Sequence, residues 1–84
     1  MEWIVVVMYE MDGDWSLGAP YSVGSSKSDA MQAIEEEIEA FKNGEDPIRV
    51  DMDVMSGTKD DPTEIDVDVY FSSQKFLKVK ATKI

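Results

Sequence analysis

Hydrophobic and polar residues follow two different periods along this chain. Residues 3–11 are a run of β-branched, aromatic and other apolar residues, typical of a strand that is covered on both faces and lies centrally in a sheet. Residues 47–55, 64–71 and 75–84 instead alternate between apolar and polar positions, which predicts half-buried strands. A loop at 56–63 and a turn at 72–74 separate these three strands.

One stretch has helical spacing. Ser26 begins it and Asp29 lies three residues later, which resembles a capping box. Four apolar residues then fall on a single helical face: Met31, Ile34, Ile38 and Phe41. The acidic side chains at 35, 36 and 39 lie towards the other side. Asn43 and Gly44 tolerate the left-handed backbone that ends many helices. The sequence therefore predicts a helix from Ser26 to Asn43.

The segment between the first strand and the helix is less regular. Pro20 lacks an N–H group, and Gly18 and Gly24 weaken strand pairing, so residues 15–24 are expected to form a short edge strand or an irregular segment. Trp3 is expected in the core. Trp15 is expected to pack as a core residue over an edge of the sheet.

These elements predict one α+β domain over residues 1–84, in the order β(β)αβββ. One helix should pack its apolar stripe on one face of a mainly antiparallel sheet of four or five strands. The other face of the sheet must then meet water or a partner.

Charge is the strongest compositional feature. Eighteen acidic residues against eight Lys and Arg give a net charge of −10. Such a balance repels nucleic acids and anionic membranes and attracts basic surfaces. We therefore expect neither direct nucleic-acid binding nor membrane binding. The lack of cysteine is typical of a cytoplasmic protein.

Most catalytic chemistry lacks its usual residues here. The chain has no His and no Cys, which removes the commonest general base and the thiolate nucleophile. It also has no glycine-rich motif of the kind that holds phosphates. We therefore expect neither an enzyme nor a cofactor-binding protein.

The acidic residues of the second half are not scattered. With the apolar sets facing inward, one strand carries Asp51 and Asp53 outward, and the next strand carries Glu64, Asp66 and Asp68 outward. Tyr70 shares this outward side. Like charges opposite each other on paired strands are destabilising, so the clustering favours a docking surface for a basic partner. These six residues are the predicted partner-binding site.

Two other interpretations of this cluster stay open. Lys78 and Lys80 should lie beside the strand at 64–71 and Arg49 at the margin, so the face can be a solvated surface with cross-strand ion pairs. Alternatively, a weak calcium or magnesium site could form in a metal-responsive module, at Asp51, Asp53, Asp66 and Asp68.

Residues 9–43 resemble the start of HicB-like antitoxins. The features that carry this resemblance are a first strand, the Asp12, Gly13 and Trp15 motif, Pro20 and Gly24, and a capped helix with Ala30. The resemblance implies a protein-binding module whose partner, a toxin, is basic.

The overall profile also resembles phage-encoded anti-defence proteins, in particular anti-CRISPR inhibitors. Many of these are single, acidic, cysteine-poor α+β domains, and several block nucleic-acid channels with carboxylates. This resemblance implies a nucleic-acid mimic that acts in the cytoplasm of a bacterial host. The leading hypothesis is an inhibitor, a monomer or homodimer, that occupies the nucleic-acid-binding surface of a basic protein or complex through the six residues named above.

Overall fold

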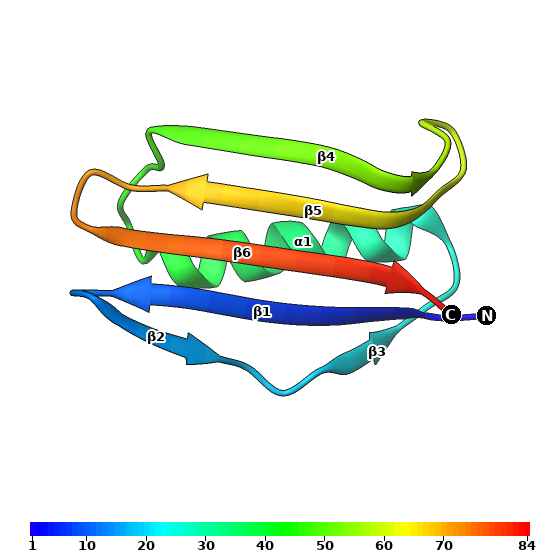
Figure 1. The fold of residues 1–84 in the computed structure, drawn as a ribbon, viewed down its shortest axis with the longest axis horizontal. Helices are drawn as coiled ribbons and strands as arrows, with labels where there is room; N and C mark the ends of the chain where they lie inside the picture. The colour runs from blue at the N-terminus through cyan, green and yellow to red at the C-terminus, as the bar shows by residue number, and fades with distance from the viewer.

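A computed structural model describes all residues from Met1 to Ile84. Six strands and one helix follow one another along the chain (Figure 1). Their bounds are β1 Trp3–Met11, β2 Asp14–Leu17, β3 Tyr21–Val23, α1 Lys27–Lys42, β4 Arg49–Gly57, β5 Pro62–Tyr70 and β6 Lys75–Lys83. The α+β class and the single helix predicted from the sequence are confirmed.

The strands form one antiparallel sheet in the order β2-β1-β6-β5-β4, and β3 also pairs with β1. The sheet has six strands rather than four or five because residues 15–24 contribute two short strands instead of one. Both lie along the outer edge of β1, with Gly18, Ala19 and Pro20 between them. The Gly18 N–H still donates to the Val7 carbonyl at 2.8 Å, so this linker follows the edge of β1 closely.

The helix begins with the predicted capping box. The Ser26 hydroxyl accepts a hydrogen bond from the Asp29 N–H, and the Asp29 carboxylate accepts one from the Ser26 N–H. Asn43 ends the helix in the left-handed conformation. Ala30, Ala33 and Ile34 are buried against the sheet, and the rest of the predicted apolar stripe is half-buried beside them. The helix is neither long nor apolar enough to cross a membrane.

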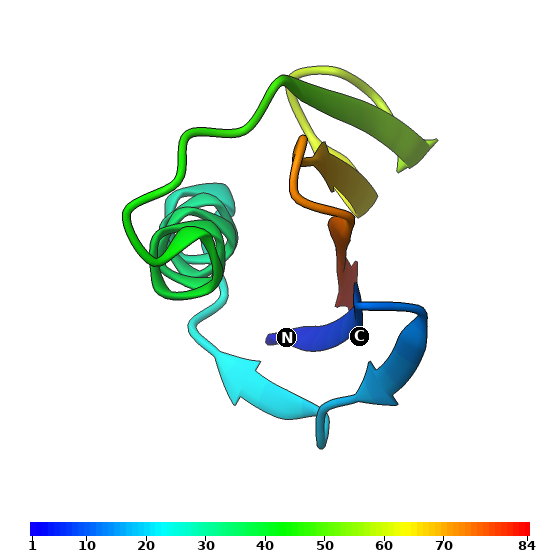
Figure 2. The same ribbon diagram turned by 90° about the vertical axis from the view of Figure 1, so that its left-hand side faces the viewer.

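The helix covers only part of one face of the sheet. It contacts β1, β3, β5 and β6 but not β4. Figure 2 shows the sheet curving around α1, with β4 at the end that lies away from the helix. The hydrophobic core is therefore confined to α1 and to the middle strands β1, β5 and β6, with Trp3 almost fully buried as predicted.

This arrangement contradicts the prediction that the strand at 47–55 is half-buried. Val50, Met52 and Val54 point to the helix side, but they remain 47%, 48% and 42% exposed. Their alternation with polar residues correctly places them on the apolar face. They stay exposed because no second helix extends over β4.

The prediction for Trp15 is also wrong. The two-residue turn at Asp12 and Gly13 places Trp15 directly opposite Glu10, on the face that α1 leaves uncovered. Its side chain is 55% exposed rather than part of the core.

The connection from α1 to β4 is fastened by Glu45. Its carboxylate accepts hydrogen bonds from the Ser73 hydroxyl at 2.6 Å and from the Ser73 N–H at 3.3 Å, and it lies 3.8 Å from Lys75 Nζ. The Ser73 hydroxyl, then its amide and the charge of Lys75, lower the pKa of the Glu45 carboxyl. Because the ionised carboxylate makes these contacts, they hold the connection between α1 and β4 against the β5–β6 turn at neutral pH.

Replacing Glu45 should therefore change how the free energy of unfolding falls as the solution is acidified. A lowered pKa in the folded state means that Glu45 stabilises the fold above its unfolded pKa of about 4.3, and that this stabilisation is lost as pH falls through the folded value. Glu45→Gln should unfold at lower urea concentration than wild type at neutral pH, and the difference should shrink below about pH 4. Glu35→Gln, the same change of charge on the exposed side of α1, is the control. A Glu45→Gln deficit of equal size at every pH would contradict this account.

Candidate functional site

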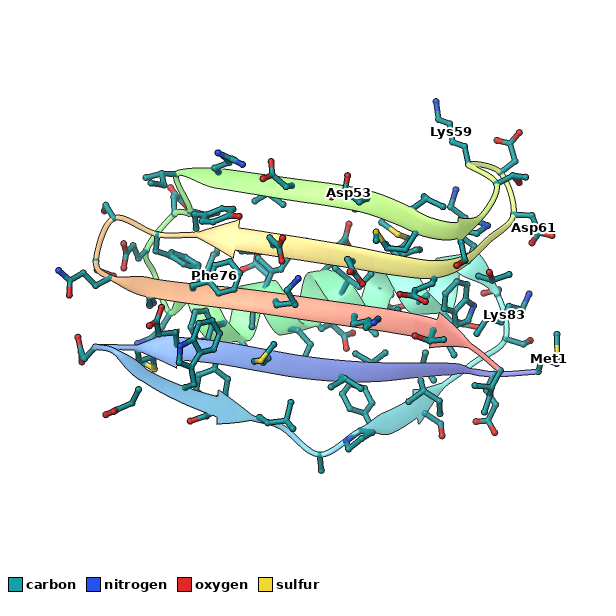
Figure 3. The ribbon with its side chains drawn as sticks, viewed as in Figure 1. Met1, Asp53, Lys59, Asp61, Phe76 and Lys83 are labelled. Atoms are coloured by element: carbon teal, nitrogen blue, oxygen red, sulfur yellow. The ribbon has the colours of Figure 1, made fainter.

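The sheet face opposite α1, here called the open face, carries all six residues of the predicted site. Asp51 and Asp53 come from β4, and the other four come from β5. Figure 3 shows this face, with Asp53 on β4 and Phe76 on β6. Period-two alternation explains the placement, because the intervening residues of β5 are buried beneath the sheet on the helix side.

The acidic strip is defined by five carboxylates, Asp51, Asp53, Glu64, Asp66 and Asp68. The strand register aligns two pairs of them directly: Asp51 lies opposite Asp68, and Asp53 lies opposite Asp66. Directly paired residues on antiparallel strands have Cα atoms only about 4.5–5.5 Å apart. Two like-charge pairs therefore stand side by side in the middle of the β4–β5 ladder.

Basic residues neutralise part of the acidic strip, in agreement with the position expected for the lysines. Lys78 Nζ lies 3.2 Å from Asp68, and Lys80 Nζ lies 3.2 Å from Glu64. The Glu64 carboxylate, by hydrogen bonding and by its charge, raises the pKa of Lys80. Both lysines come from β6, which places them beside β5 and one strand away from β4. Their charges therefore neutralise carboxylates on β5 more than those on β4.

Arg49 neutralises Asp51 within β4 itself. Its Nε and Nη2 atoms both donate to Asp51 Oδ2, at 2.8 and 2.6 Å. Hydrogen bonding by this guanidinium, together with its charge, lowers the pKa of the Asp51 carboxyl. Asp51 therefore stays ionised under mildly acidic conditions.

Asp53 and Asp66 are the two members of the acidic strip that form no ion pair, although Lys80 lies opposite Asp66 on β6 and the charge of Asp66 helps to raise the pKa of Lys80. Neither lies within 4 Å of a basic side chain. Asp53 is exposed, and one carboxylate oxygen of Asp66 is shielded from solvent without a hydrogen-bond partner. The pair therefore carries the least neutralised negative charge of the strip, above all at Asp53. A fold selected only for stability gains nothing from this arrangement.

An aromatic row crosses the open face at one end of the acidic strip. It consists of Trp15, Phe76 and Tyr70, with ring centroids 5.9 Å apart for the first pair and 5.1 Å for the second. The Arg49 guanidinium lies 4.9 Å from the centre of the Tyr70 ring and continues the row onto β4. Tyr70 is therefore half-buried between Phe76 and Arg49 rather than freely exposed.

The sequence reasoning missed two members of this row although a signal was present. Phe76 has the same parity as Lys78 and Lys80, which places it on the open face. Trp15 lies opposite Glu10 once the Asp12–Gly13 turn is given two residues. Both aromatic side chains therefore belong beside the acidic strip.

The open face presents its polar groups over a wide surface. Its carboxylates spread along two strands, and no group of three or more acidic side chains is arranged to hold a metal ion. The arrangement can attract cations over an extended surface and can stack planar or basic side chains on the aromatic row.

Comparison of the chain with protein families, with curated proteins and with solved structures gave no match. The resemblances to HicB-like antitoxins and to anti-CRISPR inhibitors stay predictions.

Removing the charges of Asp53 and Asp66 should stabilise the fold. Asp53→Asn with Asp66→Asn keeps side-chain shape, breaks none of the ion pairs and removes the repulsion between these two residues. We expect the free energy of unfolding to rise by about 0.2–1 kcal/mol in urea denaturation at low ionic strength, and the gain to shrink as salt is added.

Glu35→Gln with Asp60→Asn is the matched control, because it changes net charge equally at exposed positions away from the open face. It should stay within about 0.5 kcal/mol of wild type. A loss of stability in the Asp53 and Asp66 variant would show that the pair supports the fold.

Proposed function

We propose that this protein binds a basic, nucleic-acid-binding protein through the acidic strip and thereby blocks nucleic acid from that partner. The observation that carries the proposal is the direct opposition of Asp53 and Asp66, neither of which forms an ion pair. A binding partner that supplies Lys or Arg would convert this repulsion into attraction. The free protein then retains a local instability that only the complex relieves.

The acidic strip has the shape that this function needs. Carboxylates on alternate residues of a strand repeat about every 6.6 Å, and the two strands lie about 4.8 Å apart, so the negative charge forms an extended double row. Lys and Arg side chains that normally neutralise phosphates can bind such a row instead. The phosphates of the nucleic acid and the acidic strip would then compete for the same Lys and Arg side chains of the partner.

The aromatic row gives this surface a less charged end. Trp15 is more than half exposed, and its ring is available for stacking with an arginine or an aromatic side chain of the partner. Large aromatic residues are frequent energetic centres of protein interfaces. We assign the row the role of fixing orientation after charge has brought the partners together.

The sequence profile favours a particular class of partner, a nucleic-acid-binding complex of a bacterial defence system. Long-range attraction between the chain, at −10, and a basic groove would speed association and would weaken steeply with salt. An inhibitor that must act before its target finds nucleic acid benefits from such a rate.

Affinity capture from bacterial lysate tests this proposal. Immobilised wild-type protein at about 50 mM salt should retain a nucleic-acid-binding protein and should release it by about 300 mM salt. The variant with Asp53→Asn and Asp66→Asn should bind the purified partner at least about tenfold more weakly. Excess DNA or RNA should displace the wild-type protein from that partner.

Glu35→Gln with Asp60→Asn is again the control, and it should bind as wild type does because its lost charges lie elsewhere. Equal binding by the Asp53 and Asp66 variant would exclude the acidic strip as the interface. Binding of the true partner that does not change with salt would exclude charge mimicry.

A further inference from the structure

The sheet has one long edge that nothing covers. β4 pairs only with β5, and its nine residues leave the other side of the strand unpaired. The opposite edge differs, because β2 and β3 are only four and three residues long and Pro20 lies between them. Short strands and proline are ordinary means of protecting a sheet edge, whereas a long edge without them is ready to accept another strand.

The backbone of β4 presents free hydrogen-bonding groups at known positions. The Tyr70 carbonyl accepts a hydrogen bond from the Ile48 N–H at 2.8 Å, so the backbone groups of Tyr70 turn towards β4. Alternation along the ladder then turns the backbones of Asp51 and Asp53 towards β5. The N–H and C=O groups of the intervening residues point outward from the sheet: Val50, Met52 and Val54.

The side chains along this edge are sorted by face. Val50, Met52 and Val54 lie on the helix side beyond the reach of α1, and each is more than 40% exposed. Asp51 and Asp53 lie on the open face as part of the acidic strip. A strand that pairs with β4 would therefore meet an apolar row on one face and a carboxylate row on the other.

This pattern disfavours a second copy of the chain as the occupant. Two β4 strands joined antiparallel into one continuous sheet would bring Asp51 and Asp53 of one copy beside the same residues of the other. Each copy also has a net charge of −10. The complementary strand instead has apolar residues facing Val50, Met52 and Val54, and Lys or Arg facing the carboxylates.

We propose that β4 accepts, as a seventh strand running antiparallel to it, an extended segment of the partner in which basic and apolar residues alternate. This inference rests on the proposed function and gives the mode of binding. Backbone hydrogen bonds would provide affinity, the alternating side chains would select the segment, and the added strand would cover the exposed apolar row.

Synthetic peptides test the proposal directly. The probe is a nine-residue peptide, matching the length of β4, with alternating Val and Lys and blocked ends. Amide hydrogen exchange by NMR would measure its effect on the protein. We expect the peptide to slow exchange at Val50, Met52 and Val54 by at least about tenfold, and a peptide of the same composition in scrambled order to leave these amides unchanged.

Two N-methylated versions of the peptide test which of its backbone N–H groups bond to β4. Hydrogen-bonded residues on antiparallel strands lie directly opposite and share a face, so the valines would bond to the outward groups of β4. Peptides N-methylated on the valines should lose the protection, and peptides N-methylated on the lysines should keep it. Equal behaviour of the two methylated peptides would overturn the proposal.

A variant of the protein provides a second test of strand pairing at β4. Met52→Pro removes an N–H that points outward and none that bonds to β5, so the variant should fold, as checked by circular dichroism, and should fail to bind the peptide. Sedimentation of the free protein as a dimer, with the three amides already protected, would overturn the proposal in favour of self-association.

The results also separate this inference from the proposed function. If the alternating peptide protects no edge amide while Asp53→Asn with Asp66→Asn still abolishes capture of the partner, the edge proposal fails and the acidic-strip proposal survives. If the peptide pairs with β4 but that variant captures the partner as wild type does, the proposed function fails and the edge remains a strand-binding site.

Discussion

A single helix can cover only a small part of a six-stranded sheet, and this limit shapes the whole molecule. An α-helix with its side chains is about 10 Å wide, whereas neighbouring strands lie about 4.8 Å apart, so one helix shields roughly two strands. α1 lies mainly over β1 and β6 and reaches parts of β3 and β5. The core forms beneath it. β4 and the entire open face are left to solvent or to partners.

The distribution of charge follows from this division. Carboxylates on the open face avoid burial, and β6 lysines neutralise those within reach on β5. β4 has no basic strand on its other side. Arg49 forms an ion pair with Asp51, and no basic side chain forms one with Asp53. The uncompensated charge is thus greatest next to the uncovered edge. The acidic strip and the unpaired backbone of β4 form one continuous surface.

This surface combines three kinds of interaction. The acidic strip attracts basic groups over distance, the aromatic row at one end can stack on them, and the edge of β4 can bind a backbone. Long-range attraction favours rapid encounter, and the two short-range contacts fix the orientation. The glutamates of α1 belong to a separate surface, because the helix lies on the other face of the sheet.

Period and capping are local properties of the chain. The helix with its caps, the strands of the second half and the face on which each charged residue lies could therefore be predicted from the amino-acid sequence. It also indicated that Asp51, Asp53, Glu64, Asp66, Asp68 and Tyr70 share one face. The exposure of Val50 and Trp15 could not be predicted in this way, since burial depends on how far α1 extends across the sheet. Strand order and register likewise decided which carboxylates meet a lysine and which meet each other, because those pairings join residues far apart in the sequence.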